Sequence, residues 1–212
     1  MNALRKLTEL GSSAIGTSRV EAGALRSVFD SEAVGVVLPL LELRNGFYAF
    51  EGALHVFAEG VGAPGEWTLA EWNAEKLWKQ EYQGMADGLL CFAEDVFGMQ
   101  FCAKNGSIFR FDPETGQCEA VARDANEWAE LILHDYSLWT GHVLVHNWQE
   151  EHGPIPIGSR LVPITPFVLG GAFTLENCHV LEAAKAMQYR ASIAVQIRNL
   201  PDGATVRLRT SD

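Results

Sequence analysis

The dipeptide Asn105-Gly106 is the most specific local signal in this chain of 212 residues. It lies between two apolar segments, Met99 to Ala103 and Ile108 to Phe111. A two-residue type I′ turn needs positive φ at both central positions, which Asn and Gly adopt at the lowest cost. The dipeptide therefore predicts a β-hairpin whose register is fixed by its turn.

Apolar segments on either side extend this hairpin into an antiparallel meander. Leu89 to Ala93 precedes it, and Gln117 to Val121 follows the turn-rich sequence at 112–116. A helix should come next, because Asp124-x-x-Glu127 has the spacing of an N-cap and apolar residues then recur every three or four positions. We expect an α+β fold, with helices packed on one side of the sheet and a C-terminal strand-helix-strand extension.

Three helices are expected ahead of the meander, each from a start or stop signal. They run from about Arg19 to Val28, from about Pro39 to the Asn45-Gly46 stop, and from the capping box Thr68-x-x-Glu71 to about Tyr82. After the second helix, the aromatic residues at 47, 48 and 50 should form a buried turn, and a short strand should follow at 54–57.

The chain divides into three stretches. Residues 1–18 are expected to form a loosely ordered arm, residues 19–151 the α+β core, and residues 152–212 a proline-rich connector and extension that packs on the core, in one domain overall. Prolines at 154, 156, 163 and 166 disfavour a helix or an inner strand in the connector. The elements expected in the extension are a strand at His179 to Glu182, a helix at about Met187 to Asn199 and a last strand at Thr205 to Arg209.

The acidic charge is concentrated in the middle of the chain. Residues 66–151 contain 5 basic and 16 acidic side chains, a net charge of −11, which equals the formal net charge of the whole chain. Such a field repels nucleic-acid phosphates and anionic membranes and attracts basic proteins. The simpler alternative is a solvated acidic surface that maintains solubility.

Several classes of protein are disfavoured. No apolar run reaches the roughly 20 residues of a membrane span, and the N-terminal sequence does not resemble a signal peptide, so a cytoplasmic protein is the simplest expectation. The four cysteines form no C-x-x-C pair and are expected to be buried thiols. No cofactor is expected, because no phosphate-binding or calcium-binding loop has its full pattern.

One pair of histidines has the spacing of metal ligands. His142 and His146 could share a helix face, and Glu150 and Glu151 follow them. These residues would make the chain a metal-dependent hydrolase. Position 143 is valine, where a zinc-protease motif has glutamate, and a half-buried helix explains the same residues.

Three motifs occur in a defined order. They are Arg44-Asn45-Gly46-Phe47-Tyr48-Ala49-Phe50 with Ala53 to Phe57, then Leu90 to Asp95 with Phe97 to Phe101, then Ile108 to Gly116 with the Trp128 helix. Their order resembles that of the SUKH superfamily, which includes Syd-like proteins, fungal cell-wall synthesis regulators and many bacterial immunity proteins. The resemblance covers residues 30–140 and, less closely, the tail from Leu161 to Leu208.

The resemblance implies a non-enzymatic protein-binding domain, and many members neutralise toxins, often nucleases. A nuclease presents a basic face to phosphates, and an acidic inhibitor could be steered to that face and cover it. The residues expected to contact such a partner are Asp112, Glu114, Glu119, Glu127 and Glu130, with Trp67 or Trp72 as an apolar anchor. The alternative is a solvated carboxylate for each acid and a core position for each tryptophan. A structural scaffolding subunit that self-associates through its apolar tail is a further alternative.

Overall fold

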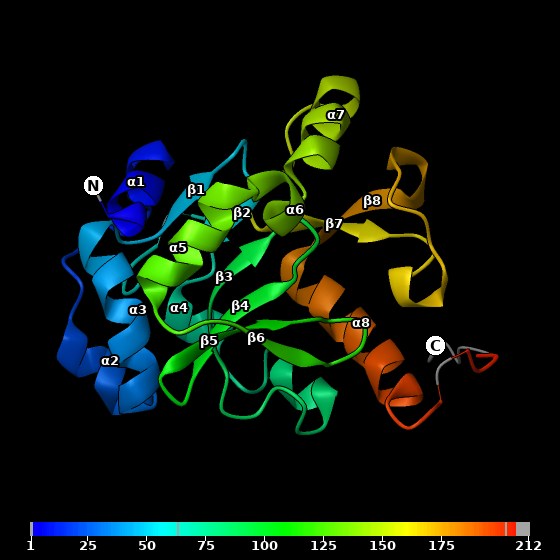
Figure 1. The fold of residues 1–212 in the computed structure, drawn as a ribbon, viewed down its shortest axis with the longest axis horizontal. Helices are drawn as coiled ribbons and strands as arrows, with labels where there is room; N and C mark the ends of the chain where they lie inside the picture. The colour runs from blue at the N-terminus through cyan, green and yellow to red at the C-terminus, as the bar shows by residue number, and fades with distance from the viewer. Residues whose placement is uncertain (1, 63, 202, 207–212) are drawn as a thin grey trace.

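The computed structural model describes residues 2–62, 64–201 and 203–206. At its centre is a six-stranded antiparallel sheet in which every strand pairs with its neighbour in sequence, in the order β1-β2-β3-β4-β5-β6 (Figure 1). A second antiparallel sheet pairs β7 with β8. The expected α+β class is confirmed. The strands are β1 (Phe47–Ala49), β2 (Leu54–Val56), β3 (Leu90–Asp95), β4 (Gln100–Lys104), β5 (Ser107–Phe111), β6 (Cys118–Ala122), β7 (Ser159–Pro163) and β8 (Cys178–Glu182).

The meander is confirmed, together with its central turn. Asn105 and Gly106 have φ values of 49° and 72°, and the strands beside them pair Lys104 with Ser107. The aromatic segment that was expected to be a turn is instead the strand β1, which pairs with β2 in antiparallel register.

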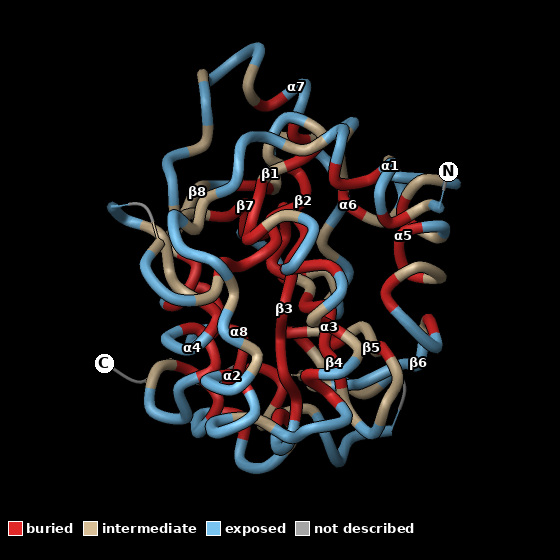
Figure 2. Tube along the Cα trace, turned by 90° about the vertical axis from the view of Figure 1, so that its left-hand side faces the viewer, coloured by how far each residue is buried: buried red, intermediate tan, exposed pale blue. Residues whose placement is uncertain are grey.

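Helices cover both faces of the large sheet, whereas one face was expected. On one face, Trp128 meets Phe92 and Phe101 edge-on at ring-centroid distances of 5.1 and 5.6 Å. On the other face, Tyr82 meets Phe111 at 5.0 Å. β3 lies between these two layers and is buried at every residue (Figure 2). The α-helices are α1 (Ala3–Leu10), α2 (Ala22–Val28), α3 (Ser31–Leu43), α4 (Leu69–Trp72), α5 (Ala125–His134), α6 (Tyr136–Thr140), α7 (His142–His152) and α8 (Ala183–Ile197), and the 3₁₀ helices are η1 (Lys79–Tyr82), η2 (Phe167–Leu169) and η3 (Leu175–Asn177).

The N-terminal stretch is ordered, which corrects the expectation of a loosely ordered arm. α1 contacts α5 and buries Leu7 completely. Beyond α1, the backbone N–H groups of Ser12 and Ile15 donate to the carbonyls of Tyr48 and Gly46 at 2.7 and 2.9 Å. These bonds hold the segment along the outer edge of β1, so that edge of the sheet is covered.

α3 begins earlier than the sequence suggested. Its N-cap is Asp30, whose carboxylate accepts from the N–H groups of Glu32 and Ala33 at 3.0 and 2.9 Å. Pro39, which was expected at the start, therefore lies inside the helix. The cap residue decided the start of this helix, and the proline is tolerated in its interior.

The helix after the Thr68 capping box is shorter than expected. The capping box itself forms, but α4 ends at Trp72. The next residue, Asn73, accepts from the N–H of Cys91 at 2.8 Å and donates to the carbonyl of the same residue at 2.8 Å. Asn73 therefore bonds to β3 through its side chain, and the chain leaves the helix to make this contact.

The C-terminal stretch packs on the large sheet. The proline connector contains β7, which was not expected, and the N–H of Leu161 donates to the carbonyl of Val96 at 2.9 Å. β8 and α8 follow where a strand and a helix were expected, and α8 buries Met187 and Ala191. The expected last strand at Thr205 to Arg209 extends beyond the described residues. None of the helices within the described ranges is long and apolar enough to cross a membrane.

Candidate functional site

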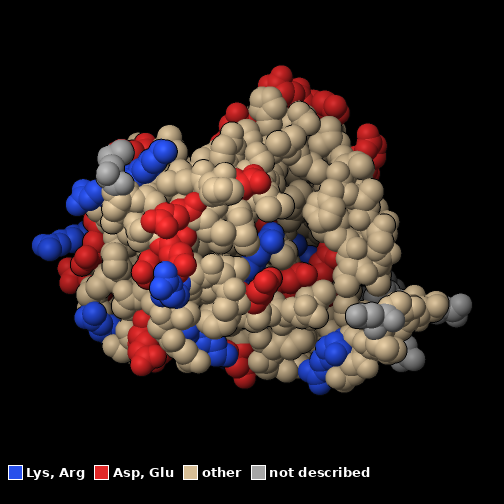
Figure 3. Space-filling model, in the orientation of Figure 1, with Lys and Arg blue, Asp and Glu red and all other residues tan. Residues whose placement is uncertain are grey.

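An open cleft lies where the ends of β3 and β5 face α6, α7 and the η2–η3 segment. It consists of two adjoining hollows of about 560 and 250 Å³, which share Phe97, Arg110 and Phe173 in their walls. Acidic and basic side chains lie side by side at the hollow in the middle of this face (Figure 3). We call this site the central cleft.

The first charged pair of the cleft is formed by Asp95 and Arg110. A guanidinium nitrogen of Arg110 lies 3.4 Å from the Asp95 carboxylate, and the guanidinium also lies over the ring of Trp139, 5.4 Å from its centroid. Asp95 accepts from the N–H groups of Phe97 and Met99, each at 2.9 Å. Burial raises the pKa of Asp95 to about 6, although Arg110 and these N–H groups oppose the shift.

Two of the predicted contact residues lie on the turn after β5. The Oδ1 atom of Asp112 accepts from the N–H of Glu114 at 2.7 Å, an arrangement that fixes the turn. One oxygen of Glu114, Oε2, accepts from the N–H of Val168 at 2.8 Å. The other oxygen, Oε1, is buried and has no hydrogen-bond partner within the described ranges. Burial raises the pKa of Glu114, because the charged form is partly desolvated.

Arg190 contributes a second guanidinium to the smaller hollow. It reaches the cleft from α8, where its Nε donates to the carbonyl of Ala186 at 3.1 Å and its Nη1 donates to the carbonyl of Phe97. No ion pair joins Arg190 to a carboxylate in the part of the chain that the structure describes. Its hydrogen bonds are made to these two backbone oxygens and, at 3.8 Å, to the sulfur of Met187.

The rim of the cleft is apolar and exposed. Leu138, Val143 and Phe173 are 67%, 58% and 66% exposed. Phe173 stacks on Phe167 with ring centroids 3.8 Å apart and meets Phe97 edge-on at 5.9 Å. Exposed apolar groups around buried charges are typical of a surface that excludes water when another molecule docks.

The remaining predicted acids lie to one side of the cleft. Glu119 is exposed on β6, directly opposite Arg110 in the strand register. Glu127 accepts from the side chain of Arg123 at 2.9 Å, and Glu130 accepts from Asn126 at 2.8 Å. The structure therefore brings Asp112, Glu114 and Glu119 around Arg110, while the two acids of α5 are occupied by neighbours in the same region of the chain.

Neither predicted tryptophan lines the cleft. Trp72 is fully buried, and its indole N–H donates to the side chain of Gln100 at 2.7 Å. It is a core residue and offers no surface to a partner. Trp67 is half-buried and lies 3.4 Å from a carboxylate oxygen of Glu182. The apolar groups exposed beside the acids are those of the rim.

The histidine pair on α7 is bound to a glutamate. His146 Nδ1 lies 2.9 Å and His142 Nε2 lies 3.7 Å from the carboxylate of Glu51. The hydrogen bond from His146 lowers the pKa of Glu51, and the same contact raises the pKa of His146. Among the residues that the structure describes, no group of three or more His, Cys, Asp or Glu side chains is arranged to hold a metal ion.

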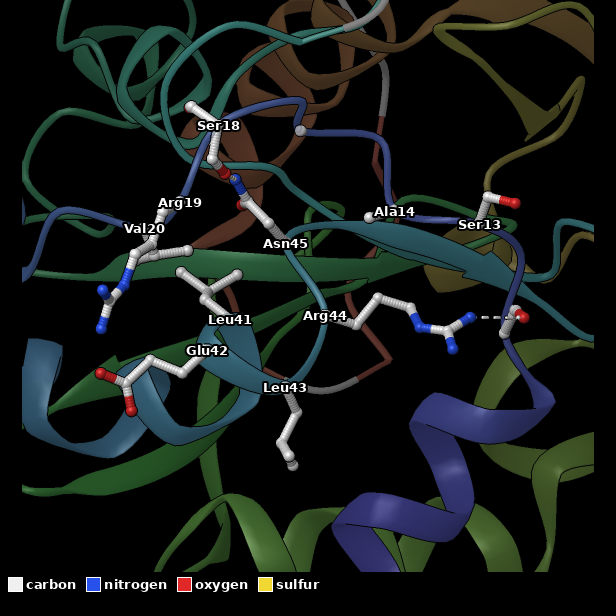
Figure 4. A pocket seen from close by; sticks show the side chains of 12 residues that line it. Ser13, Ala14, Ser18, Arg19, Val20, Leu41, Glu42, Leu43, Arg44 and Asn45 are labelled. Carbon is white, nitrogen blue, oxygen red and sulfur yellow. Dashed lines mark hydrogen bonds between the residues drawn. The ribbon is translucent and has the colours of Figure 1, made fainter.

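A hollow of about 790 Å³ lies between residues 11–20 and the end of α3 (Figure 4). Arg44 donates to the carbonyls of Gly11 and Ser12 at its wall. Asn45 is buried and donates to the carbonyls of Ser18 and Glu59. Arg44 and Asn45 therefore hold the N-terminal segment in place, which explains these two residues structurally.

The sequence analysis missed a buried ionic network between the two sheets. His55 lies between Glu94 and Glu66, with nitrogen–oxygen distances of 3.3 and 3.5 Å. Tyr48 donates to Glu66 at 2.8 Å, and Arg160 lies 2.6 Å from Glu94. The available signal was a histidine and a glutamate inside apolar strands, since such residues are rarely buried without partners.

Comparisons with known proteins give a likeness in fold. No protein-family model matches the chain, and no curated protein matches it. Among solved structures, the chain is similar to Atu4351 from Agrobacterium tumefaciens, with a TM-score of 0.56 and 12% sequence identity, over 88% of this chain and 87% of that chain. At this level of identity the likeness concerns the fold alone.

Proposed function

We propose that this chain is a non-enzymatic binding protein that neutralises a basic toxin domain, and that the central cleft with its flank is the contact surface. Nucleases are the first class of toxin to test. The proposal takes up the resemblance of the sequence motifs to immunity proteins of the SUKH superfamily. The observation that carries it is the combination in one cleft of an apolar exposed rim and the carboxylates of Asp112 and Glu114.

Charge supports a basic partner. The cleft and its flank contain four carboxylates, those of Asp95, Asp112, Glu114 and Glu119, and two guanidinium groups, those of Arg110 and Arg190. This local excess of negative charge is part of the net charge of −11 of the whole chain. Both increase the rate at which a basic protein is steered to this face.

The experiment is co-expression with the product of the adjacent gene, followed by co-purification and a growth assay. We expect the chain to restore growth and to bind with an affinity that falls at least tenfold when Asp112→Asn and Glu114→Gln are combined, since buried charge pairs at interfaces contribute about 2–5 kcal/mol each. Glu130→Gln is the matched control, because this exposed acid lies on α5 away from the cleft. Growth that is not restored, or binding that is the same in all variants, contradicts the proposal.

A further inference from the structure

The smaller hollow of the central cleft contains an acceptor without a donor. Glu114 is 4% exposed, and its Oε1 atom lacks a hydrogen-bond partner among the described residues. A buried carboxylate oxygen of this kind is costly, because it has lost its water and makes no hydrogen bond in exchange. Burial raises the pKa of the carboxylate, and the N–H groups of Val168 and Phe167, which lower it, offset that burial only in part. The hollow of about 250 Å³ that Glu114 lines is the space from which a donor could reach it.

The cations of the hollow do not supply that donor. Arg190 donates to two backbone carbonyls on its own helix and at the end of β3. Arg110 is paired with Asp95 and lies over Trp139, and although its Nε atom also lacks a partner, that atom is buried beside the ring. The hydrogen bonds of Arg190 and the ion pair of Arg110 are thus made to other groups, and Asp112 and Glu114 face the hollow as acceptors.

The walls of the hollow favour a flat cation over a compact one. Phe97, Phe167 and Phe173 contribute aromatic rings, and Phe173 is exposed at the entrance. A guanidinium group is planar, so it can lie flat on an aromatic face and present several N–H donors in one plane, whereas an ammonium group is a compact point charge. The volume is also below the roughly 300 Å³ at which pockets for drug-sized ligands begin, so it suits a single side chain.

We infer that this hollow receives an arginine side chain of the protein partner, whose guanidinium donates to Glu114 and Asp112 and stacks on Phe173. The inference rests on the proposed function and specifies the partner's contribution to the contact. Other residues of the partner would cover the apolar rim, which includes Leu138 and Val143. Desolvation of the rim would strengthen the charge-assisted bonds inside.

The test uses the full chain and three small probes, measured by chemical-shift titration in NMR. The probes are N-acetyl-arginine amide, N-acetyl-citrulline amide, which has the same shape without the charge, and N-acetyl-lysine amide. We expect the arginine probe to bind with a dissociation constant in the millimolar range, on the order of what a ligand of this size can reach. The citrulline and lysine probes should bind at least several-fold more weakly.

Two variants test whether the arginine probe binds in the smaller hollow. Glu114→Gln should weaken the arginine probe by about tenfold, the effect of one lost charge-assisted hydrogen bond. Phe173→Ser should weaken it several-fold, and because Phe173 is itself 66% exposed, this variant keeps the test valid if Glu114→Gln unfolds the protein. Ile164→Ser is the matched control, since Ile164 is 60% exposed and does not line the cleft.

The outcomes separate this inference from the proposed function. Equal binding of the arginine and citrulline probes, binding unchanged in Phe173→Ser, or no titration by the arginine probe at all overturns the inference. If the toxin is neutralised but the arginine probe does not bind, the inference fails and the proposed function stands. If the probe binds but no toxin is neutralised, the arginine pocket exists and the proposed function fails.

Discussion

Arg160 of β7 places its Nη2 atom 2.6 Å from Oε1 of Glu94 of β3, and the two side chains are only 4% and 2% exposed. This ion pair joins the two sheets inside the molecule. Because each charge depends on the other for solvation, loss of either one leaves a buried charge without compensation.

We predict that Arg160→Met and Glu94→Gln each lower the free energy of unfolding by about 3–5 kcal/mol, the usual cost of breaking a buried pair. The double variant should lose less than the sum of the two single losses, because neither charge then remains alone. Urea unfolding of the four proteins measures these values. Additive losses would show that the two residues do not stabilise each other.

Asp95 makes stability depend on pH in an unusual direction. Its pKa is raised from 3.8 to about 6 in the folded protein by burial. The folded state therefore holds this proton more tightly than the unfolded state, and the stability that this provides is full below pH 3.8 and is lost as the pH rises through 6.

Asp95→Asn should remove this dependence while its amide oxygen still accepts from the N–H groups of Phe97 and Met99. Between pH 4 and pH 7, the difference in unfolding free energy should move in favour of the variant by about 2 kcal/mol, since one pKa unit corresponds to about 1.4 kcal/mol and part of the shift lies below pH 4. Denaturant unfolding at a series of pH values measures it. A difference that stays constant with pH would contradict the prediction.

His55 gives the stability of the protein a pH dependence of the opposite sign to that of Asp95. Burial lowers its pKa below 6.5, in spite of the facing carboxylates of Glu94 and Glu66, and Arg160 contributes to the same shift. Its contribution to stability is present above pH 6.5 and is lost as the pH falls through the folded pKa. We expect His55→Gln to lose less stability than the natural chain between pH 7 and pH 5 in thermal unfolding scans. His146→Gln serves as an exposed histidine control.

Two glycines with nearly the same backbone angle allow strain to be separated from steric clash. Gly98 and Gly106 have φ values of 74° and 72°, but a Cβ at Gly98 would lie 2.6 Å from Nη2 of Arg190, while a Cβ at Gly106 would meet nothing within 4 Å. Gly106→Ala should cost about 1–2 kcal/mol of stability, the price of a left-handed residue. Gly98→Ala should cost more, and it should also weaken the arginine probe, because Arg190 has to move. Equal losses of unfolding free energy in the two variants, measured by urea unfolding, would show that the Arg190 side chain moves aside at no cost in stability.

Local signals in the sequence predicted local structure well. The turn at Asn105-Gly106 and the cap at Asp124 act on their immediate neighbours, so the meander and α5 were predicted close to their observed bounds. Signals that compete with distant contacts did less well. Asn73 ends α4 because its side chain forms hydrogen bonds with β3, and no sequence pattern within the helix predicts those bonds.

The candidate site was predictable only in part, for the same reason. Asp112 and Glu114 were predicted because they belong to the acidic middle of the chain, which was expected to contact a basic partner. Asp95, Arg110 and Arg190 come from β3, β5 and α8, and only the folded chain brings them together. The apolar side chains exposed beside the acids are those of the rim, whereas Trp72 lies in the core and Trp67 lies against Glu182.

The first helix has its partner near the middle of the chain. The N–H of Leu4 in α1 donates to the side chain of Asn126 in α5 at 3.3 Å, across a separation of 122 residues. During synthesis on the ribosome, α1 emerges before α5 and cannot dock on it until the roughly 122 residues between Leu4 and Asn126 have followed. All six strands of the large sheet precede α5 in the sequence, so a nascent chain halted before α5 exposes the face of α1 that α5 covers, and chaperones should retain it.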